Sequence, residues 1–218
     1  VIQCLLSCLE KAGVVKTLIA VRAGKGDIRE ALGGSSKGGM PLEYVDVGET
    51  PSPPFTLARA LEAHADSDIV MGFPDLLFDA PGAGGELLAA LGSAAEPDLV
   101  LGLFPHPRSR RADTVEVSPE GRVTSVIREG DQSEEAWTWG LAAWTRRCTR
   151  FLGASVNAFA AGPSPSGELE IADVIRKAIE DGLRVEGRIV SSRPFLDVGT
   201  PEGLRKALGD RAAPGPDD

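Results

Sequence analysis

The sequence predicts a layered α/β fold in which parallel strands are joined by crossover helices. Short apolar runs of strand length, such as Ile69–Phe73 and Leu99–Phe104, alternate along the chain with segments of helical periodicity. Gly and Pro residues separate these segments. The 218 residues suffice for one large domain with an ample core, and no linker is long enough to divide the chain.

The first half of the chain alternates between helix and strand. Val1–Ala12 places its apolar residues on one helical face and stops at Gly13. Pro53 and Pro54 open a later helix, because proline is tolerated in the first turn. The elements expected here are, in order, a helix at Val1–Ala12, a strand at Thr17–Val21, a small helix at Asp27–Leu32, a strand at Leu42–Val47, a helix from Pro53 to about Ala65, a strand at Asp68–Phe73, a helix at Glu86–Leu91 and a strand at Asp98–Phe104.

The second half begins with a hairpin, because two alternating segments flank the turn Pro119-Glu120-Gly121. Ile171–Asp181 is amphipathic, and Pro201 begins a closing helix. The elements expected here are hairpin strands at Thr114–Val117 and Val123–Arg128, a strand at Trp137–Ala143, a short helix at Thr145–Leu152, a loop at Ala160–Gly167, a helix at Ile171–Asp181, a strand at Val185–Val190 and a helix at Pro201–Leu208.

Composition excludes several classes of function. A formal net charge of −9 argues against duplex nucleic-acid binding, which needs clustered Lys and Arg. The apolar runs are too short to span a bilayer, and no export leader opens the sequence. Cys4, Cys8 and Cys148 are expected to be free thiols in a reducing, cytoplasmic setting. The acidic, Pro-rich segment 209–218 is expected to be a disordered tail.

Two aspartates follow predicted strands and are the strongest candidate site residues. Asp75 comes after the apolar strand Ile69–Phe73, and Asp197 ends a short strand before a Gly-Thr turn. Ligands of open α/β sheets bind at the carboxyl ends of strands, where two such carboxylates can hold one Mg²⁺ ion. The structural alternative is that Asp75 is a turn or N-cap residue and Asp197 an Asx-turn acceptor.

Several segments, in their order along the chain, resemble the nucleotidyltransferase domain of the sugar-phosphate nucleotidylyltransferases, the family that includes glucose-1-phosphate thymidylyltransferase. FLDVGTPEGLRKAL at 195–208 looks like the family's W-x-D-x-G-T-P-x-x-L-x-x-A segment, and GELEIADV at 167–174 is similar to G-E-L-E-x-T-D-V. IVMGFPDLLF at 69–78 resembles the strand that ends in a metal-binding aspartate. The resemblance covers residues 1–208 and implies a three-layer α/β/α, Rossmann-like domain with a mixed, mostly parallel sheet.

The resemblance also implies an activity and roles for single residues. Asp75 and Asp197 would be the two metal-binding aspartates, and Mg²⁺ the cofactor. Gly140 would offer backbone contact to the sugar and Glu168 would accept from sugar hydroxyls. From the residues alone, Gly140 is equally a strand glycine that allows close packing, and Glu168 an exposed acid before a helix. The partners implied are a nucleoside triphosphate and a sugar 1-phosphate, and family members commonly self-associate.

The chain departs from the family pattern at three places. The first strand of the expected β-α-β unit and the glycine-rich, triphosphate-binding loop are absent from residues 1–208, and the glycine-rich segment Gly33–Gly39 is better interpreted as a surface turn. Thr56 stands where the family often has a glycine beside the base. Arg128-Glu129-Gly130 replaces Glu-Lys-Pro, so that Arg128 would have to take over as the phosphate ligand.

Two functions from different classes remain after this comparison. The first is nucleotidyl transfer from a nucleoside triphosphate to a sugar 1-phosphate by a truncated, divergent transferase, impaired to an extent that the sequence leaves open. The second is a non-catalytic sugar-nucleotide-binding or regulatory module of the same fold. A dinucleotide-binding oxidoreductase is disfavoured, because no G-x-G-x-x-G follows the first predicted strand.

Overall fold

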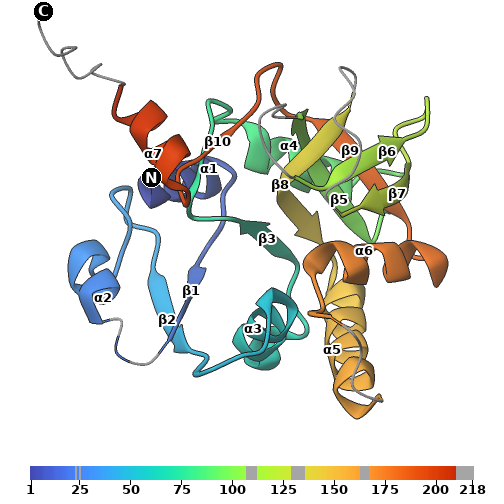
Figure 1. The fold of residues 1–218 in the computed structure, drawn as a ribbon, viewed down its shortest axis with the longest axis horizontal. Coiled ribbons are helices and arrows are strands. Elements are labelled where there is room, and N and C mark those ends of the chain that lie inside the picture. Colours follow the sequence, from blue (N-terminus) through green and yellow to red (C-terminus); the bar gives the residue numbers. More distant parts are fainter. Residues whose placement is uncertain (23, 25, 107–111, 129–135, 163–166, 210–218) are drawn as a thin grey trace, which may run out of the picture.

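A computed structural model describes the chain except for residues 23, 25, 107–111, 129–135, 163–166 and 210–218 (Figure 1). The predicted tail 209–218 therefore lies outside the described residues except for Gly209, and Glu129 and Gly130 lie outside them entirely. Residues 163–166 of the loop predicted at Ala160–Gly167 also fall outside them. The elements are α1 (Ile2–Lys11), β1 (Thr17–Val21), α2 (Gly26–Leu32), β2 (Leu42–Asp46), α3 (Pro53–Ala60), the 3₁₀ turn η1 (Glu62–His64), β3 (Ile69–Gly72), β4 (Leu76–Leu77), α4 (Ala83–Leu91), β5 (Leu99–Pro105), β6 (Thr114–Val117), β7 (Val123–Ile127), β8 (Trp137–Trp144), α5 (Arg146–Ala161), α6 (Ile171–Glu180), β9 (Val185–Ile189), β10 (Leu196–Asp197) and α7 (Pro201–Ala207).

The main sheet is mixed, as expected. Its strand order is β7-β6-β8-β5-β9, and β3 joins it by pairing with β8. Strand β8 runs antiparallel to β3, β5 and β6, β7 runs antiparallel to β6, and β9 runs parallel to β5. Strands β3, β5, β6 and β9 therefore share one direction, which β7 and β8 oppose. Most strands of this sheet therefore run in the same direction. Most hydrogen-bonded neighbours are nevertheless antiparallel, because β8 lies between strands of that direction.

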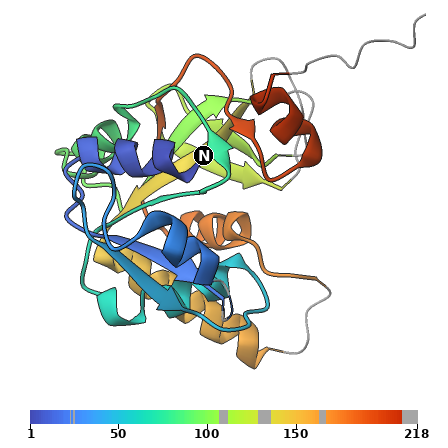
Figure 2. The same ribbon diagram turned by 90° about the vertical axis from the view of Figure 1, so that its left-hand side faces the viewer.

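The sheet lies between two layers of helices, which confirms the predicted α/β/α arrangement. Alternate residues of β5 enter two different apolar clusters, because successive side chains of a strand point to opposite faces. Leu101 packs in the cluster that contains residues of α5 and α6, and Val100 packs in the cluster that contains residues of α1 and α4. Figure 2 shows α1 on one side of the sheet and α5 with α6 on the other. Burial on both faces explains why β5 is a continuous apolar run.

Strands β1 and β2 form a separate two-stranded parallel sheet. Leu18 of β1 packs against the same cluster as Ile69 of β3, and Ile19 packs against the same cluster as Val70. Strand β1 thus places its side chains, like those of β3, between the same two helical layers. In the part of the chain that the structure describes, β1 pairs only with β2, and β3 pairs only with β8.

Three helices have clearly different bounds from those that the sequence predicts. The helix expected at Thr145–Leu152 is α5, which continues to Ala161. Gly153 lies at an open position, and the buried face continues beyond it to Val156. The helix expected to reach Ala65 ends at Ala60 and continues as the 3₁₀ turn η1. The helix expected at Glu86 begins at Ala83, three residues earlier, and includes Gly84 and Gly85.

Candidate active site

Asp75 lies in a tight turn directly after β3. Pro74 follows the end of the strand, and the Leu76 N–H donates to the Phe73 carbonyl at 3.3 Å, closing the turn. The short strand β4 then begins at Leu76. Asp75 itself is exposed. A turn at a strand end therefore presents its carboxylate at the carboxyl edge of the sheet, as the sequence predicted.

Asp197 reaches the same place from the other end of the chain. It belongs to β10, which pairs antiparallel with β4 so that Asp197 lies opposite Leu76. One residue later, the Val198 N–H donates to the Asp75 carbonyl at 2.9 Å. The β10–β4 pair thus joins two segments that are more than a hundred residues apart in sequence and fixes both aspartates by backbone hydrogen bonds.

The two carboxylates converge beside Gly199. A Cβ atom added at Gly199 would lie 2.7 Å from Asp75 Oδ2 and 3.1 Å from Asp197 Oδ1. The Gly199 N–H also donates to Asp197 Oδ1 at 2.8 Å. This last bond is the Asx turn that the sequence allowed as the structural alternative for Asp197, so the turn and the convergence of the carboxylates occur together.

The chemistry of the two carboxylates suits a Mg²⁺ ion better than a zinc ion. Among the described residues, no group of three or more His, Cys, Asp or Glu side chains is placed to hold a metal. Structural zinc sites use four protein ligands, whereas Mg²⁺ is often held by one or two carboxylates together with water and substrate phosphates. The donor types of Asp75 and Asp197 are therefore those that Mg²⁺ takes, and the ion itself stays a prediction.

Aromatic side chains pack beneath β4 and β10. Phe104 packs against Phe195 with ring centroids 5.4 Å apart and against Phe78 at 5.6 Å. A Cβ atom at Gly140 would lie 3.0 Å from Leu76 and 3.3 Å from both Phe104 and Phe195. The glycine therefore allows close packing beneath the two aspartates, and contact of its backbone with a sugar stays a prediction.

Arg128 lies beside the start of α6 and is engaged in ion pairs. Its guanidinium nitrogens are 3.6 Å from Glu170 Oε1 and 3.4 Å from Asp173 Oδ2. Glu168, which is exposed, precedes Glu170 in the same segment. The structure thus brings Arg128 and Glu168 to one place but leaves the charge of Arg128 compensated by carboxylates, so a phosphate ligand would have to compete with them.

The charges around Glu170 also affect its ionisation. Burial raises the pKa of Glu170, the Arg128 guanidinium lowers it, and the carboxylates of Glu168, Asp113 and Asp173 raise it again. Negative charge thus exceeds positive charge in this segment. The Glu170 carboxyl is consequently protonated more readily than an ordinary glutamate.

Trp139 and Asp113 lie between the paired aspartates and the Arg128–Glu170 ion pair, and neither was predicted from the sequence as a site residue. Trp139 packs against Phe73, two residues before Asp75, with centroids 5.3 Å apart, and its indole N–H donates to Asp113 Oδ2 at 3.3 Å. Trp139 is buried next to Gly140, so its position in an apolar strand was a usable signal. Asp113 follows a basic segment and carries no local pattern that marks it.

The glycine-rich segment 33–39 is a turn held against α1, as expected. The Ser36 hydroxyl and the Gly38 N–H, the latter at 2.9 Å, donate to the Glu10 carboxylate. These donors are consequently not directed to a phosphate. Thr56 occupies the position expected to flank a base. Its hydroxyl forms a hydrogen bond with the Thr50 hydroxyl, with the two oxygens 2.6 Å apart.

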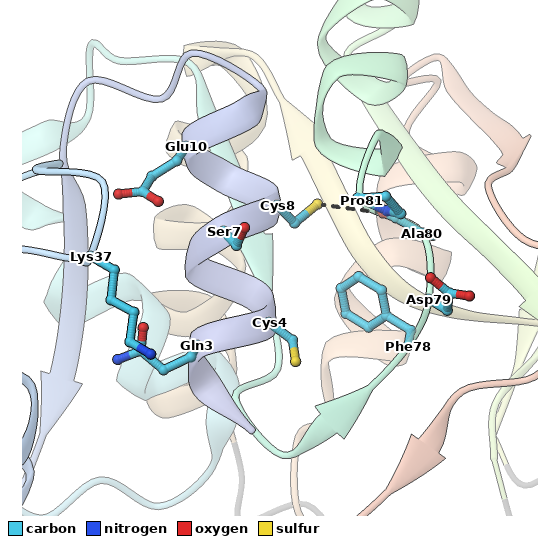
Figure 3. A pocket seen from close by; sticks show the side chains of 10 residues that line it. All are labelled: Gln3, Cys4, Ser7, Cys8, Glu10, Lys37, Phe78, Asp79, Ala80 and Pro81. Carbon is cyan, nitrogen blue, oxygen red and sulfur yellow. Dashed lines mark hydrogen bonds between the residues drawn. The ribbon is translucent and has the colours of Figure 1, made fainter.

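A separate cavity of about 380 Å³ lies over α1, between Lys37 and the segment 78–81 (Figure 3). None of the predicted site residues lines it. Its two carboxylates already have partners, because Glu10 accepts from the Gly38 N–H and Asp79 is paired with Arg193 at 2.6 Å. The cavity is therefore distinct from the paired aspartates, which lie at the other end of β4.

Cys4, on the wall of this cavity, is expected to be the one thiol that reacts readily with alkylating reagents. Burial raises the pKa of the Cys8 thiol, and burial followed by the charge of Asp98 raises the pKa of Cys148 to about 12, whereas Cys4 is exposed. Because the thiolate is the nucleophile, iodoacetamide at roughly pH 8 should modify Cys4 first. Peptide mass spectrometry of the native protein measures this, and faster labelling of Cys148 would contradict its burial.

The chain shares its fold with solved nucleotidyltransferase structures. A UDP-glucose pyrophosphorylase complexed with UDP-glucose superimposes with a TM-score of 0.73 at 14% identity, covering 94% of this chain and 84% of that one. A Bacillus anthracis protein named as a glucose-1-phosphate thymidylyltransferase, in complex with a sucrose, gives 0.74 at 15% identity, covering 99% and 84%. The inositol-1-phosphate CTP transferase from T. maritima gives 0.68 at 16% identity, covering 95% and 79%.

These superpositions confirm the fold expected from the sequence motifs. No family model matches the sequence, and no curated protein matches it. Among the helices of the described residues, none combines the length and the apolar character that a membrane span requires.

Proposed function

We propose that this protein transfers a nucleotidyl group from a nucleoside triphosphate to a sugar 1-phosphate and releases pyrophosphate, with Asp75 and Asp197 holding one Mg²⁺ ion. The observation that carries the proposal is the convergence of the two carboxylates at Gly199, at the carboxyl edge of the sheet. The shared fold with nucleotidyltransferases supports it.

In this reaction the protein positions two phosphates and compensates their charge. When bound, Mg²⁺ would neutralise the α-phosphate and stabilise the leaving pyrophosphate. Asp75 and Asp197 would hold the ion at the sheet edge, and their backbone bonds through Val198 and Gly199 would keep them oriented. The sugar phosphate oxygen attacks the α-phosphorus in line, so that no covalent protein nucleophile is needed.

The sugar phosphate would lie between the paired aspartates and the start of α6. Glu168 is exposed there and would accept from sugar hydroxyls. The backbone of β8 at Gly140 would contribute a contact from beneath. For Arg128 to bind the phosphate, it would have to exchange Glu170 and Asp173 for the ligand. A protonated Glu170 would ease that exchange, because one of the competing negative charges is then removed.

The same ion pairs favour a second candidate, a sugar-nucleotide-binding module without turnover. With its charge already compensated, Arg128 gives less help to a transferring phosphate than a free cation would. The module would act as a regulator or as a partner of another subunit. Its cellular setting would be the reducing cytoplasm that the free cysteines suggest.

Calorimetric titration, combined with an assay of pyrophosphate release, distinguishes the two candidate functions. Titration with a nucleoside triphosphate plus Mg²⁺, and with a nucleotide sugar, should give saturable heat and a raised melting temperature for either candidate. Binding with no pyrophosphate release identifies the module, and binding with release identifies the transferase. Absence of binding to all of these ligands would overturn both.

A further inference from the structure

Gly199 lies where the two aspartate carboxylates meet. We infer that Gly199 is a positioning residue whose missing side chain keeps open the space in which Asp75 and Asp197 share a divalent cation. This inference rests on the proposed function, because it concerns the same ion. It adds a requirement at a position that bears no ligand atom of its own.

The backbone of Gly199 orients one aspartate, and its missing Cβ atom leaves space beside both. Its N–H donates to Asp197 Oδ1 at 2.8 Å and orients that carboxylate. The empty position of its Cβ lies 2.7 Å from Asp75 Oδ2 and 3.1 Å from Asp197 Oδ1. A methyl group there would touch both oxygens and would occupy the side from which they converge.

An alanine at this position tests the space and leaves the chain path unchanged. Among the described glycines, Gly199 is not one of those with a positive φ, so its backbone lies outside the left-handed region that favours glycine. Alanine also keeps the N–H that Asp197 needs. The Asp75 carboxylate is the end of an exposed side chain and can rotate away from the methyl group. The fold should therefore persist while the pair of ligands separates.

Gly203, four residues later, shows the opposite situation. A Cβ atom there would collide with the backbone carbonyl oxygen of Asp197 and would lie 3.1 Å from the Thr200 hydroxyl that caps α7. The Asp197 carbonyl belongs to the backbone and cannot rotate away from a methyl group as a side chain can, so Gly203→Ala should disturb the whole turn. Of these two glycines, Gly199 is thus the one at which alanine should change the carboxylates without disturbing the fold.

The experiment measures binding of Mn²⁺, a paramagnetic substitute for Mg²⁺, by electron paramagnetic resonance in the presence of a nucleoside triphosphate. Wild type, Gly199→Ala and the control Gly153→Ala are compared, since a Cβ at Gly153 meets nothing within 4 Å. Gly199→Ala should bind the ion at least about tenfold more weakly, as variants beside metal ligands do. Its melting temperature should stay close to that of wild type, and Gly153→Ala should bind normally. Wild-type affinity in Gly199→Ala would overturn the inference.

The outcomes distinguish this inference from the proposed function. If wild type binds Mn²⁺, Asp75→Asn loses it and Gly199→Ala retains it, only the role of Gly199 fails. If wild type binds no Mn²⁺, the metal site itself fails. Should Gly199→Ala not fold, nuclear magnetic resonance of wild type decides: the Gly199 amide signal should broaden on adding Mn²⁺ and the Gly153 signal should not. A sharp Gly199 signal with Mn²⁺ bound would also overturn the inference.

Discussion

Asp75→Asn should lower the rate of pyrophosphate release by at least about 100-fold, because a metal that stabilises transition-state charge contributes several kcal/mol. The asparagine keeps the size of the side chain but removes the negative charge that binds the ion. Asp75 is exposed, and its carbonyl bond to the Val198 N–H does not involve the side chain, so the fold should be retained. The rate is measured under saturating Mg²⁺, nucleoside triphosphate and sugar 1-phosphate.

The matched control is Asp79→Asn, the same chemical change four residues further along. Asp79 is 75% exposed and paired with Arg193, so its loss should change the rate less than about twofold. Residues that act as one unit are non-additive, and Asp75→Asn combined with Asp197→Asn should therefore be little slower than either alone. Equal rates for Asp75→Asn and wild type would show that Asp75 does not hold the catalytic ion.

Phe104→Ala should destabilise the protein by about 3–5 kcal/mol, the usual cost of emptying a large buried aromatic site. Phe104 is fully buried and contacts the rings of both Phe78 and Phe195. Because Phe195 precedes β10, the cavity should also loosen the strand that carries Asp197. Urea unfolding measures the loss of free energy, and the Mn²⁺ affinity of the folded variant measures the loosening.

Leu208→Ala is the comparison for this core variant. Leu208 is 78% exposed, and its replacement should change the free energy of unfolding by less than about 0.5 kcal/mol. A loss below about 1 kcal/mol for Phe104→Ala would contradict the packing described under the site.

The aspartate pair could be predicted from sequence because each residue follows a local pattern. An apolar strand that ends at Pro74 places Asp75 at a sheet edge, and a Gly-Thr-Pro turn after Asp197 marks the start of a helix. The resemblance of these segments to one family then brought the two residues to the same site. The β10–β4 pairing that holds them together comes from two-residue strands, too short for a periodic pattern.

The surroundings of Arg128 could not be predicted in the same way. Its guanidinium pairs with Glu170 and Asp173, 42 and 45 residues later in the chain, and no spacing in the sequence fixes such a long-range contact. The sequence marked Arg128 as a basic residue in place of a lysine, whereas its partners depend on how α6 packs against β7. The extent of α5 was missed for a related reason: packing of its buried face outweighs the weak helix propensity of its glycine and small polar residues.

Release of pyrophosphate by the wild-type protein decides whether this protein is a nucleotidyltransferase. The protein is incubated with a panel of nucleoside triphosphates and sugar 1-phosphates, with Mg²⁺ or with a chelator, beside Asp75→Asn. We expect release for at least one pair of substrates, dependent on Mg²⁺ and nearly lost in the variant. Release that persists in the chelator or in Asp75→Asn would contradict the metal site, and silence across the panel would contradict the transferase and leave the binding module.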